Sequence, residues 1–263
     1  MKNNTRSPVL FLAHGSPMNA LADNDFTRAL ASLGRRLPRP QAVLCVSAHW
    51  QTRGSALTGM ARPRTIHDFG GFPQALYAVS YPAPGSPALA RRARELLGPQ
   101  TAIDEDEWGL DHGTWSVLRH LYPNADVPVV QLGVDFGASA RRHFELGEKL
   151  RPLRDEGVLI VGSGNVVHSL RRISWEEDAP AADWAAEFSD AVKARALARD
   201  YDALLAAPVS LPGGRESVPT PDHYDPLLYV LGAAHAHDAP SVLFDSIQNG
   251  SISMLSLGFG LPA

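Results

Sequence analysis

Residues 8–16 read PVLFLAHGS, an unbroken apolar run that ends at His14. Further short runs rich in Val, Leu and Ile recur along the chain: AVLCVSAHW (42–50), VPVVQLGV (127–134), GVLIVGSG (157–164) and SVLFDS (241–246). Runs that are nearly continuous, rather than alternating, are typical of strands covered on both faces. The sequence therefore predicts a sheet that is buried on both sides.

Stretches with helical spacing of apolar residues lie between these runs. They include residues 26–37, residues 89–97 and a long stretch from 183 to about 207. Alternating strands and helices predict an α/β fold, a single domain with a central, mostly parallel or mixed sheet flanked by helices. Residues 208–221 are rich in proline and glycine and predict a long loop. With no repeat or linker, we expect residues 1–263 to form one catalytic domain.

Composition limits the kinds of partner. The chain has 263 residues, 44% of them apolar, and a formal net charge of −4 without a basic block. A mildly acidic chain gains little from counterion release, so we expect neither a nucleic-acid nor a membrane partner. The single cysteine, Cys45, lies inside an apolar run and is expected to be a buried small hydrophobe. We expect a cytoplasmic protein, since a reducing compartment suits a chain without disulfides.

Three histidines follow predicted strands. His14 and His49 end two of the runs, and His168 comes four residues after 162–164. In open α/β sheets, ligands bind at the carboxyl ends of the strands. His223 and His112 stand at the starts of helix-like stretches. One such histidine alone is more often structural, but their joint placement favours a transition-metal site at this edge of the sheet.

The remaining titratable candidates are weaker. Asp222 precedes His223 and is expected either to cap a helix or to orient an imidazole. Phosphate-binding glycine motifs and a serine nucleophile elbow are absent from the sequence. The other five histidines are expected to be surface or structural residues: His67, His120, His143, His235 and His237.

Several motifs together resemble one enzyme family. They are FLAHGSPMNAL, VSAHWQT, HDFGGFPQALYAVSYPAPG, GLDHGTWSVLRHLYP, GSGNVVHSLR and PTPDHYDPLLYVLG. In order and spacing, from about Pro8 to Gly260, they resemble the 4,5-DOPA extradiol dioxygenase family. This family belongs to the class III extradiol ring-cleavage dioxygenases, related to protocatechuate 4,5-dioxygenase.

The resemblance implies roles for the five histidines. His14, His49 and His223 correspond to the metal ligands. His168 corresponds either to a fourth neighbour of the metal or to the acid–base group. His112 corresponds to a pocket histidine that contacts substrate or oxygen.

The resemblance also implies the chemistry. Fe(II) is the expected working metal, and the expected partners are a small catechol-type substrate and O2. An all-histidine site suits Zn(II) equally well, so zinc is also expected to occupy it. Trp115, Phe72, Tyr77 and Tyr224 are candidates for an aromatic wall against the ring, or for core.

Two other functions stay open at this stage. A zinc-dependent hydrolase would use a metal-bound water as nucleophile and would need no oxygen. A non-enzymatic protein of the same fold would bind a metal or ligand without turnover. The sequence leaves open the preferred catechol, the bond that is cleaved and the oligomeric state.

Overall fold

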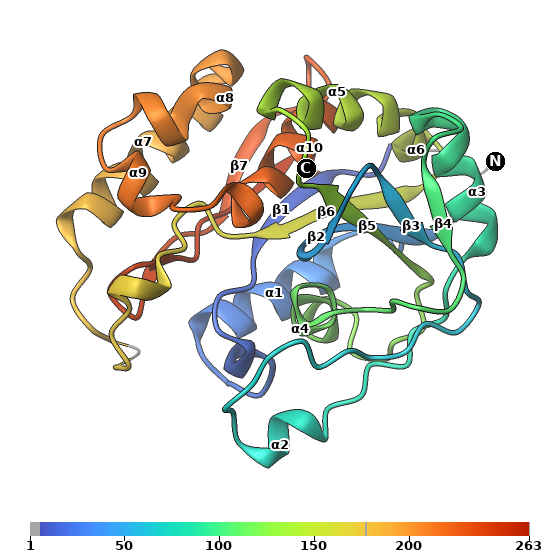
Figure 1. Cartoon of the computed structure of the whole chain (residues 1–263), viewed down its shortest axis with the longest axis horizontal. Helices are drawn as coiled ribbons and strands as arrows, with labels where there is room; N and C mark the ends of the chain where they lie inside the picture. Colours follow the sequence, from blue (N-terminus) through green and yellow to red (C-terminus); the bar gives the residue numbers. More distant parts are fainter. Residues whose placement is uncertain (1–5, 177, 263) are drawn as a thin grey trace.

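A computed structural model describes residues 6–176 and 178–262. Its central element is an eight-stranded sheet with the order β4-β3-β5-β2-β6-β1-β10-β7 (Figure 1). The four middle strands are parallel neighbours: β5 (Val129–Asp135), β2 (Ala42–Thr52), β6 (Val158–Gly164) and β1 (Val9–Ala13). Each coincides with an apolar run in the sequence, so the prediction of buried strands is confirmed.

Antiparallel pairs flank this parallel centre and make the sheet mixed. β10 pairs antiparallel with β1 and with β7, and β3 pairs antiparallel with β5. The flanking strands are β10 (Ser256–Phe259), β7 (Pro240–Phe244), β3 (Ala56–Thr58) and β4 (Ala102–Asp104); a separate small sheet holds β8 (Ile247–Gln248) and β9 (Ile252–Ser253). The predicted α/β fold with a mostly parallel or mixed sheet is confirmed.

Helices cover both faces of the sheet (Figure 1). Val9 and Phe11 of β1 belong to one hydrophobic core, whereas Leu10 and Leu12 belong to the other, because successive side chains of a strand point to opposite faces. One core contains residues of α1 (Asp25–Arg36) and α4 (His112–Leu121). The opposite core contains residues of α3 (Pro87–Leu97), α5 (Ala140–Leu150) and α10 (Asp225–Ala233).

The long helix predicted from 183 to about 207 is wrong in its length. The structure has two helices there, α7 (Asp183–Ala198) and α8 (Tyr201–Ser210). Arg199 lies between them in the left-handed conformation, with a φ of 58°. A left-handed residue ends a helix, because its carbonyl no longer points along the helix axis.

The loop predicted for residues 208–221 is also wrong in part. α8 continues through Pro208 to Ser210, and α9 (Gly214–Ser217) follows. Proline cannot donate a hydrogen bond to the carbonyl four residues earlier, which here belongs to Leu204. The Tyr224 hydroxyl donates to this carbonyl at 2.9 Å and satisfies it. The helix therefore tolerates its proline.

The other helices are short: η1 (Pro17–Ala20), α2 (Gln74–Tyr77), α6 (Pro152–Asp155), η2 (Leu170–Arg172) and η3 (Pro221–His223). Among the described residues, we find no helix with the length and apolarity to span a membrane.

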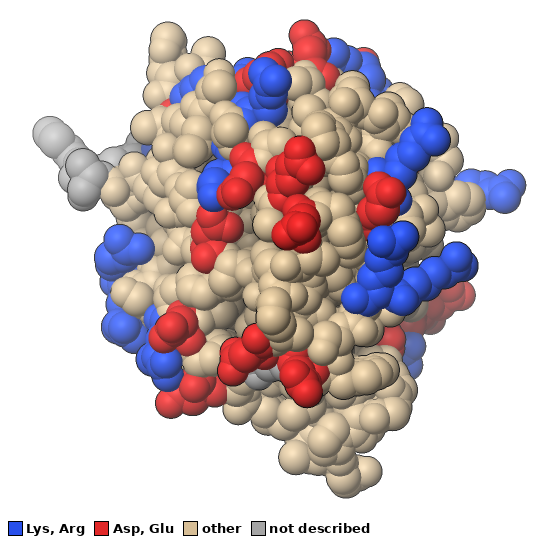
Figure 2. Space-filling model, turned by 90° about the vertical axis from the view of Figure 1, so that its left-hand side faces the viewer, with Lys and Arg blue, Asp and Glu red and all other residues tan. Residues whose placement is uncertain are grey.

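Figure 2 shows the side that carries α7, α8 and α9 in Figure 1. On that face, acidic side chains gather near the centre and basic ones lie mainly toward the margins.

Candidate metal centre

Five histidines from separate elements meet at the carboxyl ends of the parallel strands. His14 directly follows β1, and His49 lies near the end of β2. His112 is the first residue of α4, His168 follows β6, and His223 ends η3. The structure thus brings together all the site residues that the sequence predicts.

The imidazole rings lie close to one another. The ring centroid of His49 is 3.8 Å from that of His112 and 4.9 Å from those of His14 and His223. The ring of His168 stacks on that of His223, with centroids 3.5 Å apart and an interplanar angle of 7°. The five rings therefore form one cluster.

A serine sets the orientation of His14. Its Nδ1 lies 3.0 Å from the Ser163 hydroxyl, and that hydroxyl donates its own proton to the Gly113 carbonyl. Ser163 must then accept from Nδ1–H, which leaves Nε2 of His14 with a lone pair. The two residues meet because β1 and β6 are paired in parallel, with Leu12 opposite Ser163.

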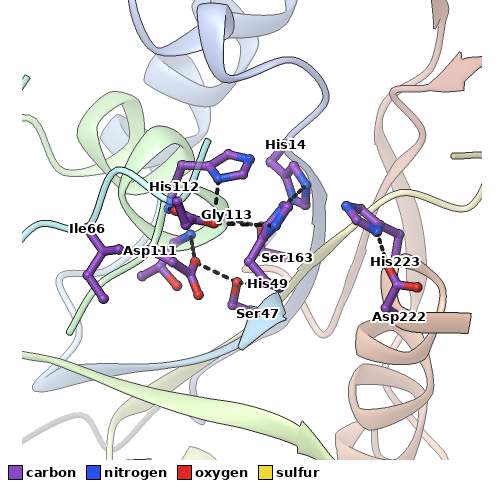
Figure 3. A network of polar contacts seen from close by, with 12 residues as sticks. His14, Ser47, His49, Ile66, Asp111, His112, Gly113, Ser163, Asp222 and His223 are labelled. Atoms are coloured by element: carbon purple, nitrogen blue, oxygen red, sulfur yellow. Dashed lines mark hydrogen bonds and ion pairs between the residues drawn. The ribbon is translucent and has the colours of Figure 1, made fainter. Parts of the chain in front are cut away.

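A carboxylate orients the ring of His223, as Ser163 orients the ring of His14. Asp222 accepts a hydrogen bond from Nδ1 of His223, so the expectation that Asp222 orients an imidazole is confirmed (Figure 3). Burial alone would raise the pKa of Asp222, but the hydrogen bond and the charge interaction with His223, together with further hydrogen bonds, outweigh burial and lower this pKa. Nε2 of His223 is buried and has no hydrogen-bond partner among the described residues. An orphaned buried lone pair marks a position for a ligand.

Asp68 is a functional candidate that the sequence reasoning missed. Its Oδ2 lies 2.8 Å from Nδ1 of His112 and 3.4 Å from Nδ1 of His49. Its Oδ1 accepts the backbone N–H of His112 at 2.8 Å. The only signal in the sequence was its place in the HDFGG motif. Nothing in the spacing shows that residue 68 approaches residue 112.

The donor set fits a transition metal. Nε2 of His14 and Nε2 of His49 are 3.0 Å apart. Two imidazole nitrogens bound to one metal at about 2.0–2.1 Å are separated by roughly 3 Å when they meet at a right angle. The donor atoms of His14, His49 and His112 all lie within 4.8 Å of one another. The orphaned Nε2 of His223 provides a further candidate.

Three of the histidines are in the form that binds metals. Burial lowers the pKa values of His14 and His49 well below the ordinary value, and repulsion from the neighbouring histidines lowers them further. Burial and His223 together lower the pKa of His168 to about 3. These three rings are therefore neutral at pH 7, and the neutral imidazole is the ligand form.

Aromatic side chains adjoin the cluster on one side. Phe69 lies 5.5 Å from His112, 5.4 Å from Phe72 and 5.3 Å from Tyr77, as ring centroids. Trp115 is 6.2 Å from Phe69. The sequence reasoning missed Phe69, which is the link between the predicted aromatic residues and the histidines.

Tyr224 does not belong to this aromatic group. Its ring packs against Phe188, its hydroxyl bonds to Leu204, and it is 1% exposed. The second alternative for Tyr224, a place in the core, is confirmed.

The expectation that Cys45 is a buried small hydrophobe is confirmed as well. Its thiol is buried in β2, and burial raises its pKa to about 12.

An α/β domain with neutral imidazoles at its strand ends defines a candidate metal-dependent enzyme. Residues 7–257 match the family model described as the catalytic LigB subunit of aromatic ring-opening dioxygenase. The chain is 52% identical over 261 residues to the 4,5-DOPA dioxygenase extradiol of Escherichia coli strain K12, covering 98% of this chain and 96% of the relative.

Two further comparisons agree. A Beta vulgaris protein of the same name is 35% identical over 257 residues, covering 95% of this chain and 96% of the relative. A crystal structure of an uncharacterised Escherichia coli K12 protein superposes with a TM-score of 0.85 at 47% identity, covering 97% of this chain and all of that chain. This chain therefore belongs to the LigB family of aromatic ring-opening dioxygenases. It is an extradiol ring-cleavage dioxygenase, as its motifs indicated.

Proposed function

We propose that this chain, acting as one catalytic domain, opens catechol-type rings beside the diol, with DOPA-like compounds as substrates. The observation that carries the proposal is the convergence of the imidazoles: Nε2 of His14 and Nε2 of His49 are 3.0 Å apart, and Nε2 of His223 is buried with no hydrogen-bond partner among the described residues. Ser163 and Asp222 support the proposal, because each accepts a hydrogen bond from the Nδ1–H of a histidine. The Nε2 atom of that histidine is then free to bind a metal.

His14, His49 and His223 would hold the metal, which we propose to be Fe(II). Bound Fe(II) supplies a Lewis acid for the two catechol oxygens and the redox chemistry that activates O2. The ring centroid of His223 lies 5.2 Å from that of His14 and 4.9 Å from that of His49, whereas that of His112 lies 5.5 Å and 3.8 Å away. His223 is the better third ligand, because its Nε2 has no other described partner.

We propose that His168 accepts a proton from the substrate. Its backbone N–H donates to the Ser217 carbonyl at 2.9 Å, and its ring rests on that of His223. A neutral imidazole held beside the ligands can receive a hydroxyl proton when the diol binds.

The aromatic group offers a flat apolar surface for the ring. Phe69 contacts both His112 and Phe72, so a catechol lying on it would have its diol at the histidine cluster. An apolar wall also excludes water, which strengthens polar interactions inside the site. This arrangement supports a planar aromatic substrate.

The test is oxygen uptake by metal-free protein reconstituted anaerobically with Fe(II) and then given L-DOPA or catechol. A zinc-loaded sample is the control. We expect one O2 consumed per catechol and a yellow ring-opened product with Fe(II) alone. Turnover with zinc in the absence of oxygen would instead support a hydrolase. No uptake across a panel of catechols, with iron confirmed at the site, would refute the proposal.

Two substitutions separate the roles of the histidines. His14→Ala should lose bound metal, because it removes a proposed ligand. His168→Ala should keep the metal and lose turnover, because it removes the proposed base. Metal content is measured by atomic emission on the same samples. If His168→Ala also loses the metal, His168 is a ligand and not the base.

A further inference from the structure

Asp68 occupies an unusual position relative to the cluster. Its side chain is 14% exposed and touches two of the five histidines, although it belongs to none of the strands or helices that carry them. Both carboxylate oxygens are used on His112, one by the ring and one by the backbone N–H. Such two-point contact fixes the direction of the carboxylate relative to the ring.

The segment that carries Asp68 is firmly anchored. Ile66 donates its backbone N–H to the Leu110 carbonyl at 2.8 Å, and its own carbonyl accepts the indole N–H of Trp115 at 2.7 Å. Tyr81 donates its backbone N–H to the Thr65 hydroxyl at 3.0 Å. Asp68 is therefore presented to the cluster from a fixed position, and the aromatic residues that follow it are held with it.

We propose that Asp68 is a positioning residue that holds His112 in one tautomer. A carboxylate can only accept, so Nδ1 of His112 must carry the proton. Nε2 of His112 then presents a lone pair to the cluster. In this tautomer, Nε2 accepts a hydrogen bond and cannot donate one. Asp68 thereby makes His112 an acceptor for a substrate hydroxyl, a consequence that rests on the proposed function.

The Asp68 oxygen that accepts from the ring of His112 also reaches a second histidine. The same oxygen lies 3.4 Å from Nδ1 of His49, so Asp68 also restrains a proposed metal ligand. Asp68 thus contacts two histidines of the site and directly precedes Phe69 of the aromatic group.

The test is Asp68→Asn, which keeps the shape of the side chain and adds N–H donors. The amide oxygen can still accept the backbone N–H of His112, which turns the NH2 group toward Nδ1. We expect His112 to switch to the Nε2–H tautomer. Histidine-selective 15N labelling and long-range proton–nitrogen spectra of zinc-loaded protein report this switch directly. Asp126→Asn is the matched control, because Asp126 pairs with Arg39 on the surface.

The kinetic expectation is a fall in kcat of about 10–100-fold, as for other residues that orient site histidines, with metal content retained and KM changed less. If Asp68→Asn fails to fold, Asp68→Ala with added formate replaces it, and formate should restore turnover in part. An Nε2–H tautomer in the wild type, or an unchanged tautomer in Asp68→Asn, would overturn the inference. The spectra report the tautomer of His112 even if no catechol is turned over. A failure of this inference can therefore be distinguished from a failure of the proposed function.

Discussion

Gly164 lies where β6 ends against the segment that carries His223. The backbone N–H of Asn165 donates to the His223 carbonyl at 2.9 Å, so the two segments are in direct contact. A Cβ atom at Gly164 would lie 2.2 Å from that carbonyl oxygen. Ordinary contact begins at 3.4 Å, so Gly164→Ala must move the His223 backbone by 3.4 − 2.2, about 1 Å.

This displacement has two expected effects. Overpacking of this kind destabilises a protein by about 1–3 kcal/mol. Distances from ligand to metal tolerate changes of only about 0.2 Å, so a shift of about 1 Å at His223 should weaken metal binding by at least tenfold. Metal affinity is measured by competition with a chelator, and stability is measured by urea unfolding of the metal-free protein.

Gly34→Ala is the matched control. A Cβ atom at Gly34 would lie 2.0 Å from the Leu121 carbonyl oxygen, where α1 packs against α4 and neither residue is a proposed ligand. We expect it to lose similar stability and to keep its metal affinity. If Gly164→Ala binds metal as tightly as Gly34→Ala, then His223 is not a ligand, and the assignment of the third ligand fails.

Two predictions concern stability rather than metal binding. Tyr224→Phe leaves the Leu204 carbonyl without the hydroxyl that replaces the missing proline bond, and should cost about 1–3 kcal/mol in the free energy of unfolding; an unchanged urea midpoint would contradict this. Burial alone would lower the pKa of His143, but Asp225, 3.4 Å from it, raises this pKa above the ordinary value. Its stabilising contribution is therefore complete below about pH 6.5 and is lost as pH rises through the folded-state pKa. Urea unfolding between pH 5.5 and 9 should show this loss, and His143→Gln should remove it.

The sequence was sufficient for the parallel centre of the sheet because those strands are buried on both faces. A doubly covered strand has no solvent side, so it reads as a continuous apolar run such as residues 42–46. The histidines at the strand ends could be predicted from the same pattern, since histidines that directly follow such runs must meet at one edge of the sheet. His112 and His223 lie at the starts of helices and were placed by motif resemblance.

The sequence was not sufficient where a contact depends on how a connection folds back. Asp68 and Phe69 lie in a connection between strands, and only its fixed course brings them to His112. The continuation of α8 from Pro208 to Ser210 was missed for a similar reason. Pro208 predicts a break, and the hydroxyl that compensates for it comes from Tyr224, sixteen residues further on.

The placement of negative charge would let the proposed all-histidine site serve a chelating diol. Fe(II) oxygenase sites commonly include one carboxylate ligand. Here Asp222 accepts a hydrogen bond from Nδ1 of the proposed ligand His223, and Asp68 lies 3.4 Å from Nδ1 of the proposed ligand His49. Carboxylate partners of this kind raise the basicity of an imidazole ligand, so they favour metal binding without occupying a coordination position. A site of neutral ligands also leaves the full charge of the metal for the substrate, and a catecholate brings the negative charge that the ligand set lacks. We therefore expect the affinity for an ionised diol to depend on the metal more strongly here than where a carboxylate is already bound.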